Sequence, residues 1–477
     1  MRFSVWKFFL FSAFSVLWFG LPSNPARALS EERAQPSIQS VPARLSLAEA
    51  VRISLAESPQ IKQSALRLLL AKSALMTAED LTTTTVFAGV SQASIGDRSD
   101  TTLSAGSRLS WERRQGDSLS AVVVPASSSN LTSSAQIEYR RPLMRQSGRL
   151  SSPNIRIVRA NYDLASQNLQ MYLDRQNIVE ATIANYFGAV RARDLIVVRE
   201  ADVQIAEETV RIARRKLEEG LIAEIELSRA EIQLASSRDA LVLQRRAYRD
   251  ALDRLLLGMG LKVGAQTDLT DTAPAARETL DADSLVEEAM ANRKDLLVLE
   301  IDRQRQELEA SLADDDVRAS LDLVGSYSKA GIGLGGSGFN SQDNWRAGLD
   351  YSIPLGDVAR RERRINTRRA LDQLVIDTEF RRQEIRNEVL AAIRRVDAAG
   401  QTIDIFQNNL QTAEFNLNLA RRMVEEGLVT NRDILEAQVA LTSTRSNLLS
   451  AQIDYYLSLL SLRRALGRDI AGEIVSQ

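Results

Sequence analysis

Two carboxylates three residues apart, Asp433 and Glu436, are the residues whose type and spacing best suit chemistry in this chain. Residues three apart lie on one face of a helix, so the two acids predict a small negative patch. The chain contains no histidine and no cysteine, which excludes histidine general bases, cysteine nucleophiles and thiolate or imidazole metal sites. Carboxylate chemistry and sites for hard cations remain. We therefore expect no enzyme and no cofactor.

The acids follow a long helical hairpin. An apolar seam with spacings of three and four residues indicates a helix that packs along a neighbour. The seam consists of Val389, Ala392, Val396, Ala399, Ile403, Phe406, Leu410, Ala413, Leu417, Ala420 and Val424. Gly427 then suits the left-handed conformation that ends a helix, and a second helical pattern begins at Ile434.

The same hairpin occurs earlier in the chain. Residues 213–221, ARRKLEEGL, parallel residues 420–428, ARRMVEEGL, at a constant offset of 207. An ungapped match centred on a turn glycine is a strong repeat signal. We predict two homologous halves, each consisting of a helix, strands, a very long helix, a turn and a returning helix.

The start of the chain has the features of an exported protein. Arg2 and Lys7 precede the apolar run 8–21 and the small-x-small site Ala26-Arg27-Ala28, which predicts a signal peptide. The run is shorter than the roughly 20 apolar residues of a membrane-spanning helix. We expect a signal peptide at 1–28, a flexible segment at 29–44, a first repeat at 45–260, a linker at 261–282, a second repeat at 283–468 and a tail at 469–477.

Within the repeats, local signals place the elements. Ser46-Leu-Ala-Glu49 and Ser284-Leu-Val-Glu287 have capping-box spacing, which predicts a helix start at each serine. The strands are expected at about 82–142 and 320–354, and the helical hairpins at about 153–258 and 358–466. The helix that opens the second half is expected to run unbroken from Ser284 to about Asp315.

Alternation and turn residues predict four strand-like segments in the first half and two in the second. So few strands leave unpaired sheet edges, which need strands of other chains. Trp111, Trp345 and Tyr351 lie at or near strand ends, as expected for a transmembrane barrel with interface aromatics. A soluble sheet with ordinary core aromatics is the alternative, and the signal peptide favours the barrel.

This order of elements resembles the TolC family of outer-membrane channel-tunnels. The family's opening pattern LxxAxxxAxxxxPxI is similar to residues 47–61, where Leu47, Ala50, Pro59 and Ile61 match and Ser54 replaces the second alanine. Its strand–proline–leucine junctions are similar to Arg141-Pro-Leu143 and Ile353-Pro-Leu355. The resemblance covers essentially the whole mature chain.

The resemblance implies a mainly α protein with a β-barrel part. Three copies would form a homotrimer whose barrel lies in outer-membrane lipid of a Gram-negative-type bacterium, continuous with a helical tunnel in the periplasm. Such tunnels dock on a periplasmic adaptor and on an inner-membrane pump or ABC transporter. The family barrel has twelve strands, whereas this chain has an extra hairpin around 103–124, which is either an extracellular excursion or a change to the barrel.

The resemblance also assigns roles at the hairpin turns. Gly220, Leu221, Gly427 and Leu428 would face the adaptor. The alternative is purely structural: each glycine ends a helix and each leucine covers the turn.

Asp433 and Glu436 look like the acidic pair of the family's periplasmic constriction, with Glu436 in place of a second aspartate. Six carboxylates from three chains would then form a cation-selective ring. A solvated acidic face is the alternative. Glu226 holds the equivalent place in the first half, where a gate contact would lie.

We therefore expect a passive outer-membrane exit duct for efflux or type I secretion. Residues 331–338 lack the Lys-Ser/Thr of a nucleotide-binding loop, so energy would come from the partner pump. The alternative is a periplasmic coiled-coil scaffold or adaptor subunit, and a secreted carboxylate hydrolase ranks third. The basic cluster 360–369 is interpreted as a charged helix face, with no nucleic acid as partner, because the chain is acidic overall.

Overall fold

The computed structural model describes residues 42–95, 98–127, 132–271, 281–332, 340–425 and 431–475. The residues from Ala43 onward form one unit. The predicted signal peptide and almost all of the segment 29–44 lie outside the described residues.

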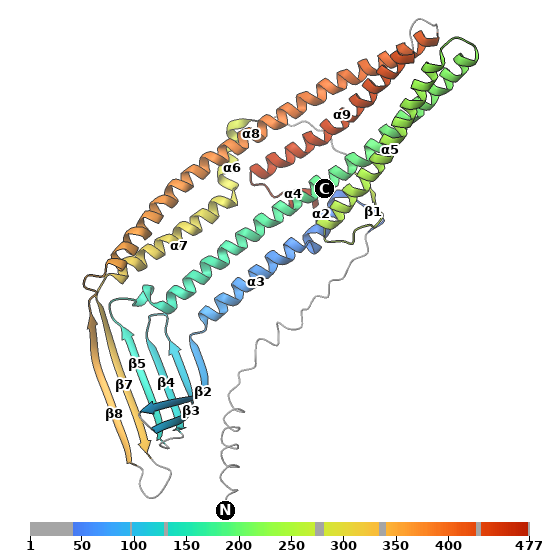
Figure 1. Cartoon of the computed structure of the whole chain (residues 1–477). Helices are drawn as coiled ribbons and strands as arrows, with labels where there is room; N and C mark the ends of the chain where they lie inside the picture. Colours follow the sequence, from blue (N-terminus) through green and yellow to red (C-terminus); the bar gives the residue numbers. More distant parts are fainter. Residues whose placement is uncertain are drawn as a thin grey trace, which may run out of the picture. The chain divides into compact units, whose positions relative to one another are not determined.

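Eight of the helices form two matching sets, one in each half (Figure 1). The first set is α2 (Leu47–Glu57), α3 (Pro59–Glu79), α4 (Ser152–Glu218) and α5 (Glu224–Gly258). The second is α6 (Ala282–Asn292), α7 (Lys294–Asp316), α8 (Val358–Glu425) and α9 (Asn431–Ala465). Helices α5 and α9 have 35 residues each and start 207 residues apart, so the sequence repeat is also a structural repeat.

The long helices pack in pairs, α4 against α5 and α8 against α9. Helix α4 has 67 residues and α8 has 68, which is about 100 Å of helix. The predicted seam is buried: Val389, Val396 and Ile403 of α8 pack with Tyr455 and Leu459 of α9. The heptad prediction is confirmed for the second hairpin.

The two predicted capping boxes differ in outcome. Ser46 is the N-cap of α2, and its Oγ accepts a hydrogen bond from the Glu49 N–H at 3.2 Å, as predicted. The prediction at Ser284 is wrong, because α6 begins earlier, with Asp281 as N-cap. Ser284 lies inside the first turn, where its hydroxyl donates to the Asp281 carbonyl at 3.2 Å and is not placed to cap the helix.

The helix predicted from Ser284 to Asp315 is also broken. Arg293 has extended backbone, with φ −63° and ψ 117°, and separates α6 from α7. The first half has the same break at Ser58, before Pro59. Nothing as visible as a proline marks the second break, which explains why the sequence did not reveal it.

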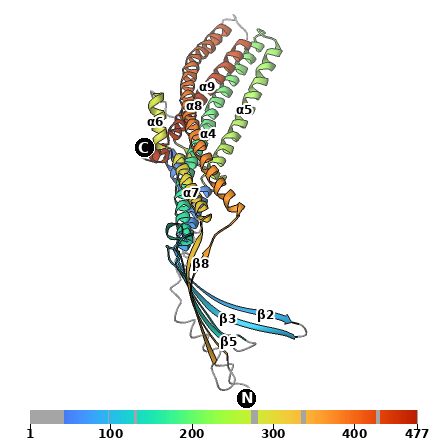
Figure 2. The same ribbon diagram turned by 90° about the vertical axis from the view of Figure 1, so that its left-hand side faces the viewer.

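Six strands form one antiparallel sheet, in the order β2-β3-β4-β5-β7-β8. They are β2 (Thr82–Ile95), β3 (Arg98–Glu112), β4 (Ser118–Ser127), β5 (Thr132–Pro142), β7 (Ser320–Ile332) and β8 (Asn340–Ser352). The predicted division into four strands and two is confirmed, and several strands are longer than predicted. Figure 2 shows the sheet extending from one end of the helices.

Smaller elements surround the middle of α4. Strands β1 (Arg44–Leu45) and β6 (Asp268–Leu269) form a parallel pair, and α10 (Ile470–Val475) packs near α2. Tyr186 is fully buried, and its hydroxyl donates to the Leu45 carbonyl at 3.0 Å and to an Asp271 carboxylate oxygen at 3.2 Å. Burial raises the pKa of the Tyr186 hydroxyl to about 12. This tyrosine therefore ties the linker between the halves to α4.

An ion network joins α7 to α8 beside a cavity of about 620 Å³. Asp295, in the first turn of α7, accepts from Arg293 at 2.7 Å and from Arg381 at 3.0 Å. Both arginines also pair with Glu388, at 2.9 and 3.0 Å. Burial opposes ionisation of Asp295, but the hydrogen bonds and charges of the two arginines outweigh it and lower the pKa of this carboxyl.

The lowered pKa of Asp295 predicts a loss of stability in acid. A depressed carboxyl pKa contributes stability that is complete above the ordinary value of about 3.9 and is lost as pH falls through the folded-state value. We expect Asp295→Asn to lower the free energy of unfolding by about 1–3 kcal/mol at neutral pH, since it weakens charged hydrogen bonds. The melting temperature of the variant should fall less between pH 6 and pH 3 than that of the wild type.

The matched control is Asp250→Asn, whose carboxylate makes an exposed pair with Arg246 at 3.7 Å. Exposed pairs contribute little, so this variant should melt as the wild type does. Identical pH profiles for Asp295→Asn and the wild type would contradict the assignment.

Candidate functional site at the turns of the helical hairpins

The first hairpin turn is closed by backbone hydrogen bonds around Gly220. The Gly220 N–H donates to the Leu217 carbonyl at 2.9 Å, and the Leu221 N–H donates to the Lys216 carbonyl at 2.8 Å. This pair of bonds is a Schellman motif, which requires a left-handed residue after the helix. Gly220 has φ +72°, so the structural reason for a glycine here is complete.

Leu221 does not cover the turn. Its side chain is 66% exposed, whereas Ile222 packs against Val210, Ala213 and Ala230 of the hairpin core. The leucine is therefore an exposed apolar residue at the turn. The sequence pattern did not distinguish the two adjacent aliphatic residues, because either one fits the position.

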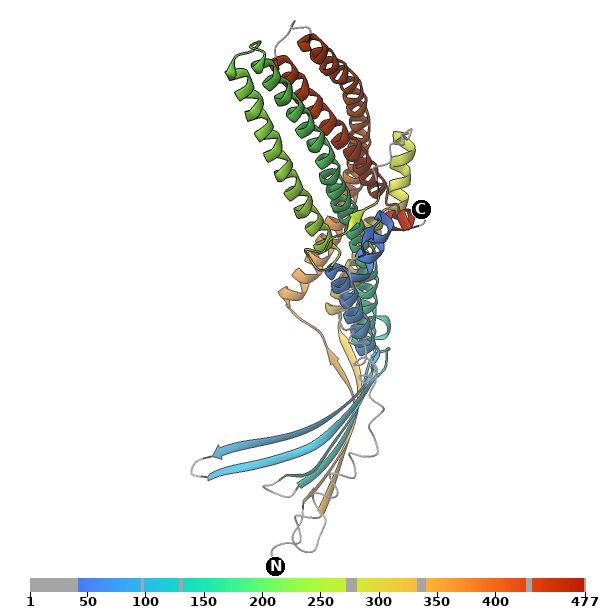
Figure 3. The ribbon, with the colours of Figure 1, turned by 90° about the vertical axis from the view of Figure 1, so that its right-hand side faces the viewer.

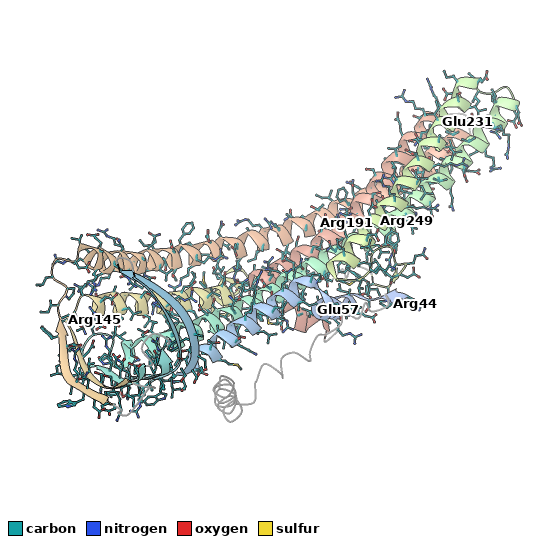
Figure 4. All side chains as sticks on the ribbon, turned by 60° about the horizontal axis from the view of Figure 1, so that its bottom comes forward. Arg44, Glu57, Arg145, Arg191, Glu231 and Arg249 are labelled. Atoms are coloured by element: carbon teal, nitrogen blue, oxygen red, sulfur yellow. The ribbon has the colours of Figure 1, made fainter. Side chains whose placement is uncertain are left out.

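Charged pairs cover the surface of this turn. Figure 4 shows Glu231 near the turn end of α5, and its carboxylate pairs with Arg214 of α4 at 3.2 Å. Glu226, the predicted gate residue, pairs with Arg229 of its own helix at 2.7 Å. Its role in a gate stays a prediction.

The second turn is only partly described. Helix α8 ends at Glu425 and α9 begins at Asn431, so Gly427 and Leu428 lie outside the described residues. The Lys216 Nζ donates to the Val424 carbonyl at 2.6 Å. This bond joins the end of α4 to the end of α8, so the two hairpins meet close to their turns.

The predicted acidic pair lies in the first turns of α9, and both side chains are exposed. Arg432 donates to Glu436 at 2.8 Å, a contact between residues four apart. Sequence reasoning missed this arginine although the spacing was readable, since opposite charges four apart pair on a helix. The patch of Arg432, Asp433 and Glu436 therefore carries one net negative charge per chain rather than two.

A buried polar cluster joins the two hairpins deeper in the bundle. Asp202 of α4 accepts hydrogen bonds at its carboxylate from Gln438 at 2.7 Å, from Thr442 at 3.2 Å and from Ser237 at 3.3 Å. Gln438 also donates to the Asp202 backbone carbonyl at 3.0 Å. Each of these four side chains is at most 7% exposed. In the sequence, each of these residues is a polar position within an apolar helical pattern. The pairing of Asp202 with Gln438, 236 residues later, cannot be seen from the sequence.

The predicted interface aromatics share one face of the sheet. Trp345 lies opposite Tyr327, Tyr351 opposite Leu321, and Trp111 opposite Leu119. Trp345 is 80% exposed and Tyr351 61%. The guanidinium of Arg113 lies 5.0 Å from the ring centre of Trp111. The contact of these aromatics with a membrane stays a prediction.

No group of three or more acidic side chains in the described ranges is arranged to hold a metal ion. No helix in the same ranges is long and apolar enough to cross a membrane.

Comparison with known proteins supports the family suggested by the sequence. Residues 285–468 match the family described as outer membrane efflux protein. The chain is 22% identical over 320 residues to the outer membrane efflux protein BepC of Brucella suis, which covers 67% of this chain and 69% of BepC. The outer membrane protein VceC of Vibrio cholerae has a solved structure with a TM-score of 0.68 and 16% identity, covering 88% of this chain and 96% of VceC. The second half of the chain therefore matches the outer membrane efflux protein family, and the whole described chain shares its fold with VceC.

A secretion protein is also among the relatives of this chain. The alkaline protease secretion protein AprF of Pseudomonas aeruginosa is 23% identical over 306 residues, covering 60% of this chain and 61% of AprF. The family match lies in the second half of the chain, and the structural repeat extends the same architecture to the first half. BepC and VceC are both named outer membrane proteins.

The Asp202 cluster predicts a strong coupling between the hairpins. Asp202→Ala removes the buried carboxylate that accepts from Gln438, Thr442 and Ser237, so we expect a loss of about 1–3 kcal/mol in the free energy of unfolding. Gln438→Leu should cost a similar amount, and the double variant should cost less than the sum of the two. Chemical unfolding of the four proteins measures these values.

Arg238→Ala is the matched control, because Arg238 makes an exposed pair with Glu207 between α4 and α5. It should cost less than about 1 kcal/mol. Additive effects of the Asp202 and Gln438 substitutions would show that the cluster does not act as a unit.

Proposed function

We propose that three copies of this chain assemble into a passive exit duct for efflux or type I secretion. The sheets of the copies close into a barrel in the outer membrane, and the helical hairpins form a tunnel in the periplasm. The family resemblance supports three copies, and the open sheet edges described below support the need for more than one. BepC is named an efflux protein and AprF a secretion protein, which gives the two classes of duct.

The observation that carries this proposal is the pair of open sheet edges. Strands β2 and β8 are the outer strands, and neither has a partner on its outer side within the described ranges. They have 14 and 13 residues, long edges that would promote aggregation if left unpaired. Because the six strands alternate in direction, β8 of one copy is antiparallel to β2 of the next and completes the ladder.

The outer helices have exposed apolar side chains that support the same assembly. Neighbouring helices follow the order α3-α4-α7-α8 on the sheet side and α5-α4-α9-α8 on the turn side, so α3, α5 and α8 end each row. Large exposed apolar residues gather on these three helices: Leu66, Leu69, Leu70 and Met76 on α3, Ile225, Ile232 and Val242 on α5, and Val375, Ile376, Phe380 and Phe415 on α8. Packing α8 of one copy against α3 and α5 of the next buries them.

The hairpin turns lie at the opposite end of the helices from the sheet (Figure 3). In the assembled duct this end faces the inner membrane, where a periplasmic adaptor and an inner-membrane pump or ABC transporter dock. Leu221 supplies an exposed apolar contact for the adaptor. Gly427 and Leu428 belong to the same proposed surface.

The acidic patch on α9 forms the proposed constriction. Three copies bring Asp433 and Glu436 together with the three Arg432 side chains, which leaves a net charge of −3 in the ring. A ring of carboxylates in a narrow pore attracts cations and excludes anions. Arg432 moderates this selectivity, because it pairs with Glu436.

The constriction predicts opposite effects of two substitutions on ion selectivity in planar bilayers. Asp433→Asn with Glu436→Gln removes the negative charge and leaves Arg432, so cation selectivity should fall or reverse. Arg432→Ala exposes the Glu436 charge, so cation selectivity should rise. The reversal potential under a salt gradient measures both.

Each outcome bears on a separate part of the proposal. If neither variant changes the ion selectivity of the channels, the proposal of a duct stands and the proposal of a constriction on α9 is rejected. No channel from any folded helical sample would overturn the duct and favour a periplasmic scaffold. A control with Glu231→Gln, at an exposed pair that joins α5 to α4 in the first hairpin, should leave selectivity unchanged.

A further inference from the structure

The two halves of the chain differ by one insertion. Helices α3 and α7 start 235 residues apart, at 59 and 294, whereas α5 and α9 start 207 apart, at 224 and 431. From the start of the helix that precedes the strands to the start of the returning helix, the first half is therefore 28 residues longer than the second. The insertion corresponds to β3, β4 and their turn. Without them, each half has one strand after its short helix, α3 or α7, and one strand before its long helix, α4 or α8.

The inserted hairpin lies inside the sheet rather than at its end. Strand β3 pairs with β2 from Thr82–Trp111 to Ile95–Arg98, and β4 pairs with β5 from Ser118–Arg140 to Val124–Ser134. Strands β2 and β5 are therefore separated by two strand positions. Without the hairpin, β2 would have to move by about 10 Å to reach β5, given a strand spacing of about 4.8 Å.

The hairpin has the same two faces as the other strands. Residues directly opposite in an antiparallel pair point to the same side. One row runs Leu109, Ala121, Ile137, Tyr327 and Trp345 across five strands, and the adjacent row runs Ser110, Ser120, Glu138, Ser326 and Arg346. These two rows lie on opposite faces of the sheet, so β3 and β4 are in register with the others. The ion pair of Lys329 and Asp343 is a charged interruption of the Leu109 face.

Exposure separates the two faces clearly. The large apolar strand residues that are exposed in the described part of the chain all lie on the Leu109 face: Val86, Leu109, Leu119, Val123, Ile137, Leu323, Tyr327, Trp345, Leu349 and Tyr351. An exposed and largely apolar face that extends over six strands, with charged and hydroxyl side chains on the other face, is the pattern of a barrel wall in lipid. Strands β3 and β4 have 15 and 10 residues, enough to span a bilayer when tilted.

The turn between β3 and β4 is anchored at the junction of sheet and helices. The Gln115 carbonyl accepts from the Gly148 N–H at 3.0 Å, and the Arg114 carbonyl accepts from the Ser151 hydroxyl at the start of α4. Gly116 has φ +98°, and a Cβ there would lie 2.9 Å from Pro142. This close fit fixes the turn at the periplasmic rim.

We propose that β3 and β4 are lipid-facing wall strands, so that each copy contributes six strands and three copies form an eighteen-stranded barrel. The acyl chains of the membrane contact the apolar face formed by Leu109, Leu119 and Val123. This inference rests on the proposed trimeric outer-membrane duct. Barrel diameter grows roughly linearly with strand number, so the barrel is about 1.5-fold wider than one of twelve strands. A barrel of this size leaves an open aqueous channel. The part of the duct that limits the size of the cargo is then the helical tunnel.

The absence of cysteine makes the test direct, because each introduced cysteine is a unique labelling site. Single variants Leu109→Cys and Val123→Cys place a bimane fluorophore on the apolar face, and Arg108→Cys and Val122→Cys place it on the polar face of the same strands. Leu349→Cys and Asp350→Cys give the matched pair on β8, a strand outside the insertion. The full-length proteins are reconstituted in phosphatidylcholine vesicles with or without brominated acyl chains.

We expect bromolipid to quench the labels at 109 and 123 several-fold more than the labels at 108 and 122. The ratio of quenching between the two faces should equal the ratio between the labels at 349 and 350. Quenching at 349 with none at 109 and 123 would overturn the inference and leave the hairpin outside the membrane. No quenching at 349 either would overturn the membrane barrel itself, and this inference with it. Electron microscopy of the wild type in lipid nanodiscs gives a second readout: eighteen strands support the inference, and twelve contradict it.

Discussion

The backbone hydrogen bonds at the edges of the sheet constrain the whole protein. A β-strand leaves a row of N–H and C=O groups on each side, and in this chain β2 and β8 each leave one row open. Such edges require another strand, because unpaired polar groups are costly in lipid and aggregation-prone in water. Two independent features, open strand edges and exposed apolar side chains on α3, α5 and α8, therefore point to the same ring of copies.

The two halves differ in their sheets while their hairpins stay the same length. The returning helix has 35 residues in both hairpins, and a change of one turn would leave part of its apolar seam unpaired. A sheet has no such limit along its hydrogen-bonding direction, since a two-strand insertion preserves both alternation and direction. The 28-residue difference falls where the architecture tolerates it.

Polar groups inside the helical bundle specify how the two hairpins meet. An apolar seam tolerates small shifts in register, whereas the Asp202 carboxylate accepts from side chains of two other helices in one arrangement. The cost of burying an unpaired carboxylate or amide makes other registers unfavourable. The bond from Lys216 to Val424 adds a tie close to the turns, so the proposed constriction is held by both hairpins.

The sequence alone determined the features that depend on near neighbours. The heptad seam from Val389 to Val424, the turn at Gly220 and the four-plus-two division of strands follow from spacing, left-handed geometry and alternation. The Arg432–Glu436 pair could also be predicted from the sequence, because the two residues are one helical turn apart. The repeat, in turn, made the two hairpins recognisable as copies.

The tertiary structure decided what depends on distant residues or on small energy differences. The N-cap of α6 at Asp281 instead of Ser284, and the packing of Ile222 instead of Leu221, are choices between nearby residues with similar local preferences. The pairing of Asp202 with Gln438, and the position of β3–β4 between β2 and β5, join segments that no local pattern relates. Local periodicity sets which face of an element is apolar, and only the packed fold sets what that face meets.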